Sequence, residues 1–117
     1  MIRPNLLTWQ RDLYPDNHTT RLNLAIHLVT VPMFHMGLLT LVLAIVSLSA
    51  FTLLSAFIVL STTVVLQGVG HKREPKPPVP SGGLVDMVSR VIVEQLVTFP
   101  RFVLSGQFIR GWLASGR

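Results

Sequence analysis

The sequence contains no cysteine, and it has few charged residues for its length. Without cysteine the chain can form neither a disulfide nor a thiolate metal site. A metal ion would therefore bind imidazole, carboxylate or water, a donor set that suits iron, zinc or manganese. Charged residues make up 13% of the 117 residues, against roughly 25% in an average soluble domain. This deficit, together with an apolar share of 50%, indicates a lipid environment.

The positive charge of the chain is not concentrated in one basic patch. The net charge is +5, but the ten Lys and Arg residues are spread thinly, and aromatic residues that could stack on bases make up only 8%. This pattern favours anionic lipid headgroups as partners over nucleic acid. The first residues lack an apolar core followed by a small-residue cleavage site, so we expect no signal peptide. The length fits a single domain over residues 1–117.

One long stretch, residues 22–70, contains no Lys, Arg, Asp or Glu. A membrane-spanning helix needs about 20 residues, so this stretch predicts two helices, at 22–46 and 50–70. Small hydroxyl residues interrupt the apolar run at Ser47–Leu48–Ser49, where we place the turn. The stretch does not alternate apolar and polar residues, which excludes a barrel strand pattern. We therefore predict an all-α fold built on an integral membrane helical hairpin.

The remaining third of the chain has two parts with different compositions. Residues 71–83 contain four prolines and two glycines, which predicts a loop. Residues 84–113 are mostly apolar, but Asp86, Arg90 and Glu94 recur at every fourth position and form one stripe on a helix. This pattern fits an amphipathic helix in the membrane interface, and it also fits a third membrane helix that turns its polar stripe toward the hairpin.

The distribution of Lys and Arg predicts the orientation. All of these residues lie outside 22–70, so both ends of the hairpin are expected on one side of the membrane. The positive-inside rule makes that side cytoplasmic. We expect a multi-pass protein of the inner membrane in a bacterium, or of the endoplasmic reticulum in a eukaryote.

The four histidines form the candidate site. His18 lies just before the first predicted helix, His27 lies one to two turns inside it, and His71 directly follows the second. A hairpin brings its two open ends together, so these three imidazoles should converge and could hold a divalent ion. His35 lies eight residues beyond His27, roughly 12 Å deeper along the helix, and is a further candidate ligand only if the helix bends.

Two carboxylates could complete such a site. Glu74 is the carboxylate nearest to His71 in sequence, and we take it as the candidate catalytic group. Glu94 could enter from the third helix and support the ligands from outside.

Polar residues that flank the histidines have two interpretations each. Asn23 and Gln67 could orient the imidazoles, or they could serve only as hydrogen-bond partners between the helices. Lys72 and Arg73 could bind a substrate carboxylate or a phosphate headgroup, or they could anchor the topology of the chain.

The same residues carry a resemblance to a known family. It rests on three motifs in order: Tyr14-x3-His18-x4-Asn23-x3-His27-x4-Pro32, then Gln67-x2-Gly70-His71-x2-Glu74, then EQLVTFPRF at 94–102. Together they resemble the 2-hydroxy-palmitate dioxygenase-like family, catalogued as domain of unknown function 962, in its short bacterial form. The resemblance implies an iron(II)-dependent oxygenase that uses molecular oxygen to shorten 2-hydroxy fatty acids by one carbon. It also implies iron ligands at His18, His27 and His71.

Two other functions stay open at this point. A histidine from each hairpin helix could bind a haem or a quinone. Alternatively, the chain could be a non-enzymatic membrane module whose histidines only satisfy polar groups. A two-helix hairpin buries little surface, so self-association into a homo-oligomer is a further expectation.

Overall fold

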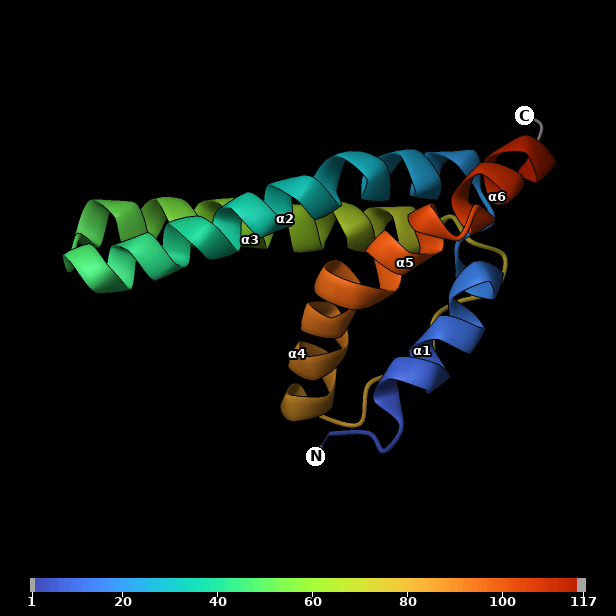
Figure 1. The fold of residues 1–117 in the computed structure, drawn as a ribbon, viewed down its shortest axis with the longest axis horizontal. Coiled ribbons are helices and arrows are strands. Elements are labelled where there is room, and N and C mark those ends of the chain that lie inside the picture. The colour runs from blue at the N-terminus through green and yellow to red at the C-terminus, as the bar shows by residue number, and fades with distance from the viewer. Residues whose placement is uncertain (1, 116–117) are drawn as a thin grey trace.

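A computed structural model describes residues 2–115, and these residues form helices and turns with no strand. Two long helices, α2 (Arg21–Ser47) and α3 (Ala50–Lys72), run side by side in opposite directions and make up most of the length of the molecule (Figure 1). The all-helical prediction is therefore confirmed.

The two long helices meet at the turn that the sequence predicts. The side chains of Thr20 and Ser49 accept hydrogen bonds from backbone N–H groups in the first turns of α2 and α3, as N-cap residues do. Leu48 adopts the left-handed conformation with φ 54° and reverses the chain between the helices. We call residues 47–49 the far turn, and we call the other end of the pair, where α2 begins and α3 ends, the open end.

Both long helices are apolar enough to cross a membrane by length and composition. In their most apolar stretches only 28% of residues in α2 and 17% in α3 are buried inside the protein. Large apolar side chains instead point outward, among them Met36, Val46 and Phe51, which are 62–80% exposed. Exposure on this scale is unusual in a water-soluble fold and is typical of a lipid-facing surface.

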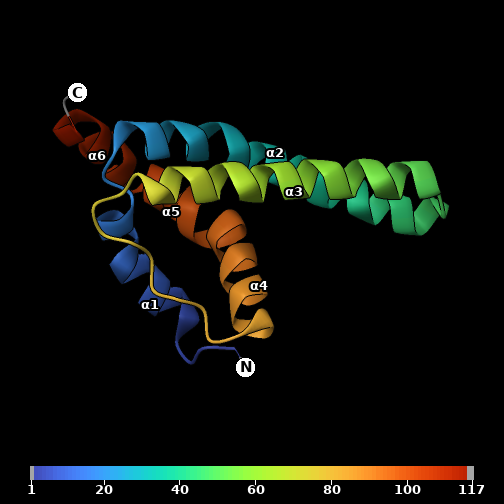
Figure 2. The same ribbon diagram turned by 180° about the vertical axis from the view of Figure 1, so that it is seen from behind.

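The end of α3 differs slightly from the sequence prediction. The helix continues through His71 and Lys72 before the chain leaves it at Arg73, so the predicted loop over 71–83 begins two residues late. The loop then passes behind the molecule to reach α4 (Figure 2). His71 is consequently fixed in the last turn of a helix rather than in a flexible segment.

The N-terminal part of the chain forms α1 (Leu6–Leu13) and a short 3-10 helix, η1 (Tyr14–Asn17), which lead directly into α2. The C-terminal part forms α4 (Leu84–Val93), the π-helical turn η2 (Glu94–Thr98), α5 (Phe99–Leu104) and α6 (Gln107–Ser115).

The structure corrects the expectation of one helix over 84–113. Pro100 has no N–H and its ring crowds the preceding turn, and the backbone widens ahead of it, with Phe99 N–H donating to the carbonyl of Glu94 five residues back. Gly106, with φ 85°, then separates α5 from α6. This positive φ is readily available to glycine and costs other residues free energy.

The buried core lies at the open end. It is formed by aromatic and aliphatic side chains from η1, α2, α5 and α6, with Trp112 packed against it; its members are Tyr14, Leu24, Val31, Phe99, Phe102 and Phe108. The core holds the N-terminal and C-terminal segments against the start of α2, and the histidines lie at its edge.

Candidate metal centre

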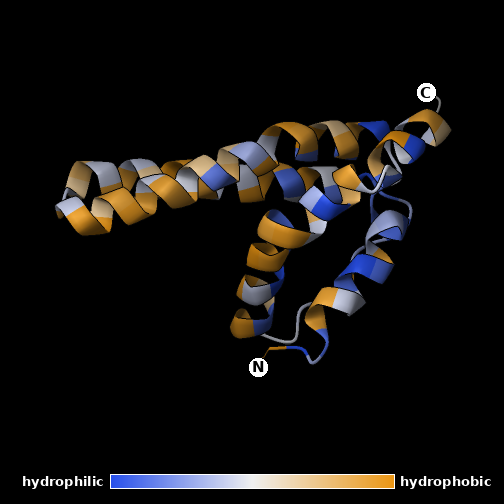
Figure 3. Cartoon of the chain, in the orientation of Figure 1, coloured by the Kyte–Doolittle hydropathy of each residue, from blue (hydrophilic) through white to orange (hydrophobic). Residues whose placement is uncertain are grey.

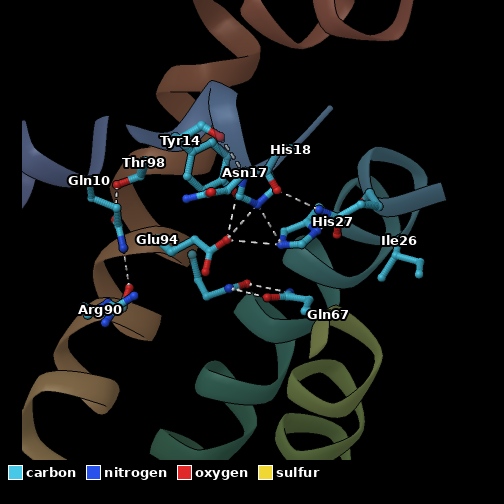
Figure 4. A network of polar contacts seen from close by, with 12 residues as sticks. Gln10, Tyr14, Asn17, His18, Ile26, His27, Gln67, Arg90, Glu94 and Thr98 are labelled. Atoms are coloured by element: carbon cyan, nitrogen blue, oxygen red, sulfur yellow. Dashed lines mark hydrogen bonds and ion pairs between the residues drawn. The ribbon is translucent and has the colours of Figure 1, made fainter. Parts of the chain in front are cut away.

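Four side chains from four separate segments converge at the open end. One ligand atom from each of His18, His27, His71 and Glu94 can be chosen so that all four atoms lie within 4.8 Å of one another. Each pair of imidazole rings stands nearly perpendicular, with centroids 4.6–5.1 Å apart. In Figure 4 dashed lines join the Glu94 carboxylate to the His18 and His27 rings.

The backbone fixes which nitrogen of two histidines faces the centre. His18 Nδ1 lies 2.8 Å from the carbonyl oxygen of Tyr14, and His27 Nδ1 lies 3.0 Å from that of Asn23. A carbonyl oxygen can only accept, so each Nδ1 carries the proton and donates it. In a neutral imidazole the other nitrogen, Nε2, is then a bare acceptor, which is the form that binds a metal.

Three acceptors therefore face one another. His18 Nε2 and His27 Nε2 are 3.3 Å apart, and Glu94 Oε2 lies 3.1 Å from the second and 3.5 Å from the first. The His18 and His27 side chains are 3% and 0% exposed, so water does little to relieve the repulsion between their lone pairs. A cation placed among these atoms would convert the repulsion into attraction.

His71 supplies a second sign that a group belongs here. Its Nδ1 is buried and has no hydrogen-bond partner among the described residues. A buried polar atom without a partner costs free energy, and such atoms in a native fold call for an explanation. The three imidazoles and the carboxylate thus fit a divalent ion with a mixed nitrogen and oxygen donor set.

Tyr14 holds two of the four ligand residues at once. Its hydroxyl donates to Glu94 Oε2 at 2.7 Å, its carbonyl accepts from His18, and its ring stacks on the His18 imidazole with centroids 3.7 Å apart. Sequence reasoning interpreted Tyr14 as an interfacial aromatic residue and as part of the family motif, and it predicted no contact with the site. Its spacing of four residues from His18 within one short helical stretch was the signal for direct contact.

Burial and mutual contacts set the charge of this group. Burial lowers the pKa of His18, and hydrogen bonding to Glu94 only partly opposes this. Burial alone would raise the pKa of Glu94, but hydrogen bonds from protonated His18 and His27 would outweigh it and hold that pKa well below its usual range. Burial and the Glu94 charge together raise the pKa of Tyr14. A metal ion bound by these side chains would take the place of the protons on the imidazoles.

The structure places the two carboxylates differently from the sequence prediction. Glu74, the candidate catalytic group from the sequence, does not reach the cluster. Its carboxylate accepts hydrogen bonds from the backbone N–H and the hydroxyl of both Thr19 and Thr20 and from Asn23 Nδ2. Glu94, expected to support the ligands from outside, places its carboxylate among the imidazoles. The sequence did contain a signal for Glu94: it is an ionisable residue in a mostly apolar segment, and such residues often belong to functional sites.

His35 stays apart from the cluster. Its Nε2 hydrogen-bonds the carbonyl oxygen of Gln95 in the π-helical turn. Gln95 follows Glu94 directly in this turn, so the contact helps to position Glu94. His35 therefore forms a hydrogen bond with another segment of the chain, and its ring lies away from the three imidazoles.

The amides near the site have distinct partners. Asn23 orients His27 through its backbone carbonyl and holds Glu74 through its side chain. Gln67 and Gln95 form a reciprocal pair, with Nε2-to-Oε1 distances of 3.1 and 2.8 Å, and Gln67 also donates to Thr30. Sequence reasoning missed Gln95. The Gln67–Gln95 pair ties α3 to the turn that carries Glu94.

A cavity of about 210 Å³ adjoins the cluster on the side of α1, α4 and the loop. Its polar end reaches the cluster at His18, His71 and Glu94, and apolar walls continue away from it along Trp9, Leu13, Met87 and Val91. Lys72 and Arg73 are exposed and do not line it, whereas Arg90 does. The expected cationic clamp next to His71 is thus outside this cavity.

Fold and site define the class of this protein: an all-helical chain with two long apolar helices and a buried cluster of three histidines and one glutamate. No family model, curated protein or solved structure matches the chain. The assignment to a particular family therefore stays a prediction from the sequence motifs.

Proposed function

We propose that this chain is a membrane-embedded, iron(II)-dependent oxygenase that cleaves the C1–C2 bond of 2-hydroxy fatty acids. The observation that carries the proposal is the convergence of His18, His27, His71 and Glu94 within 4.8 Å. Imidazole and carboxylate donors with room for exogenous ligands are typical of non-haem iron oxygenases. The sequence resemblance supplies the substrate class.

The surroundings of the cluster suit an amphiphilic substrate. The polar end of a fatty acid would lie at the cluster, and its chain would follow the apolar walls of the cavity. The two apolar helices support placement in a bilayer, where such a substrate is dissolved. All Lys and Arg residues lie outside 22–70, so the open end would face the cytoplasm.

The reaction balances without an external reductant. R–CHOH–COOH and O₂ give R–COOH, CO₂ and H₂O: the C1–C2 bond breaks, C2 is oxidised to a carboxyl group, and O₂ accepts the four electrons released. A bound iron(II) ion would activate O₂ and chelate the 2-hydroxycarboxylate. The protein residues hold the imidazole tautomers through Tyr14 and Asn23, and the Tyr14 hydroxyl keeps Glu94 in place.

The test measures iron and turnover in the same preparations. The full chain is purified in detergent, loaded with Fe(II) without oxygen, and supplied with 2-hydroxyhexadecanoate and O₂. We expect about one iron per chain and release of CO₂ with the acid shortened by one carbon. His27→Gln and Glu94→Gln should lose most of the iron and at least tenfold in rate. Asp12→Asn, which changes an exposed carboxylate outside the cluster, is the control that should keep both.

Four results would contradict the proposal. If the wild type binds no iron, the proposed metal centre is rejected. The same conclusion follows if both His27→Gln and Glu94→Gln keep all of their iron. A strong visible haem band on purification would favour the haem-binding alternative. Bound iron without turnover would reject the substrate class. Circular dichroism of each variant establishes that the helices have formed.

A further inference from the structure

Helix α4 carries a row of large apolar side chains that nothing in residues 2–115 covers. These side chains are 40–71% exposed; they are Leu84, Val85, Val88 and Ile92, and Leu96 in η2 continues the row. They recur at steps of three to four residues after Val85, so they share one side of the helix. A contiguous apolar face of this kind indicates an interaction surface.

The opposite side of α4 is already occupied by α1. Gln10 donates to the backbone carbonyl of Arg90, the Arg90 guanidinium lies 5.1 Å from the Trp9 ring centroid, and Tyr14 donates to Glu94. The polar stripe thus faces protein, and the apolar row faces outward. In Figure 3 hydrophobic colour covers the side of α4 toward the far turn, and hydrophilic colour lies on the side toward α1.

The direction of α4 differs from that of the long helices. In Figures 1 and 2 it runs across the α2–α3 pair instead of along it. If the pair crosses a bilayer, a helix with this direction lies along the membrane plane. Its apolar row then points into the acyl chains, on the same side as the far turn.

The depth of α4 agrees with this placement. Exposed apolar side chains extend along α2 from Leu22 to the far turn at Leu48, which is more than enough to cross a hydrocarbon core of about 30 Å. Measured back from the far turn, about 20 residues of α2 span this core, so it begins near Leu28. The turn η2, which follows α4, meets α2 where His35 contacts Gln95. His35 lies about 10 Å inside the core, and the apolar faces of interfacial helices enter the membrane by about 5–10 Å.

We propose that α4 is an in-plane membrane helix whose apolar row is embedded in the leaflet next to the open end. The inference rests on the membrane insertion of α2 and α3 in the proposed function. Lipid is the occupant because the row continues the apolar band of the long helices at the depth where acyl chains begin. Of the two alternatives for residues 84–113, this selects the interfacial helix over a third span.

The placement also locates the entrance to the site. Met87 and Val79 are 45% and 39% exposed and also line the cavity beside the cluster. With α4 in the interface, that cavity opens at the level of the lipid headgroups. An amphiphile would then enter sideways from the leaflet, with its polar end leading toward the histidines.

The absence of cysteine makes a direct test straightforward. Single cysteines replace Val85, Val88 or Ile92 on α4, and Phe57 or Val65 on α3, in the otherwise unchanged chain. Each is spin-labelled and reconstituted in vesicles of phosphatidylcholine and phosphatidylglycerol. Power-saturation measurements with O₂ and a water-soluble nickel chelate give the depth of each label. Lys76→Cys serves as the aqueous reference.

We expect the three α4 labels at one depth within a few ångströms, inside the acyl region. The two α3 labels should differ in depth by about 12 Å. A steady change of about 10 Å from position 85 to 92 would indicate a third span and overturn the proposal. Water-exposed α4 labels, or labels shielded from both reagents by protein, would overturn it while the α3 labels still show insertion. Water-exposed α3 labels would overturn the membrane insertion itself.

Discussion

Two glutamates of this chain show how neighbouring groups decide what a carboxylate does. Glu94 Oε2 faces imidazole nitrogens and a phenol hydroxyl, in a place where a cation would complete the contacts. Glu74 is surrounded by donors alone, from Thr19, Thr20 and Asn23. Burial by itself would raise the pKa of Glu74, but the hydrogen bonds from Thr20, Thr19 and Asn23 outweigh it and lower the pKa to about 2.

The low pKa of Glu74 predicts a pH-dependent contribution to stability. The folded pKa lies below the unfolded value, so the contribution is fully present above about pH 4.5 and is lost as the pH falls toward 2. We expect Glu74→Gln to lower the free energy of unfolding by about 2–3 kcal/mol at pH 7. The gap between the two proteins should close by pH 2–3, as measured by chemical unfolding in detergent with circular dichroism.

Asp12→Asn is the matched control, because Asp12 is an exposed carboxylate whose one ion-pair partner within residues 2–115 is its neighbour Arg11. It should change the unfolding free energy little at any pH. A constant gap between wild type and Glu74→Gln from pH 7 to 3 would show that Glu74 acts through packing and not through its charge.

The pairing of α2 and α3 depends on small residues at the points of closest approach. A methyl group added at Gly70 would come within 2.3 Å of Asn23 Oδ1 and 3.3 Å of the Asn23 Cα atom, so Asn23 would have to move. Its side chain is buried and hydrogen-bonded to Glu74, which makes this movement costly. A methyl group added at Gly68 would meet nothing within 4 Å. Gly70 precedes His71 directly, so the same close approach that joins the helices sets the position of a candidate ligand.

These two glycines lie two residues apart, within a single turn of α3, and they predict opposite effects of the same substitution. Gly70→Ala should destabilise the protein by about 1–3 kcal/mol through overpacking and should weaken metal binding by displacing His71 from Asn23 and His27. Gly68→Ala should be neutral or stabilising by up to about 1 kcal/mol, since alanine favours the helix. Thermal unfolding and iron content compare the two variants. If both substitutions have equal effects, the close contact between Gly70 and Asn23 does not explain the pairing of the helices.

At the scale of the whole molecule, the cluster is where separate parts of the chain meet. His18 follows the N-terminal segment, His27 and His71 belong to the two long helices, and Glu94 comes from the C-terminal segment. The reciprocal amides of Gln67 and Gln95 add a further tie between α3 and the C-terminal segment. A bound ion would therefore connect these four segments to one another at the open end.

This arrangement predicts that a metal ion stabilises the fold as a whole. An ion present at 100 times its dissociation constant should add about 2.7 kcal/mol to the unfolding free energy. Thermal unfolding followed by circular dichroism should show a clear rise of the midpoint with Fe(II) under anaerobic conditions and a return to the starting value with chelator. His27→Gln should show no rise. If Fe(II) does not change the midpoint of thermal unfolding of the wild type, this would argue against a preformed site.

Much of the architecture was predictable because its causes are local. The uncharged run over 22–70 and the hydroxyl residues at 47–49 predicted two helices and their turn, and the structure places the turn there. The topology of that turn also predicted that the three histidines converge. Pro100 indicated an end or a bend in the C-terminal segment. The π-helical turn ahead of it and the break at Gly106 were not predicted, because the apolar pattern continues through both.

By itself the sequence determined an all-helical chain, two apolar helices of membrane-spanning length, and a histidine group at their open end. These features follow from composition and from periodicity along a single helix. Only the tertiary structure decided which carboxylate joins the histidines. Glu94 reaches them because α4 packs on α1 and the widened turn carries its side chain inward, whereas Glu74 meets a ring of N–H and hydroxyl donors. Contacts between segments so far apart in the chain depend on tertiary packing, which a local sequence pattern does not predict.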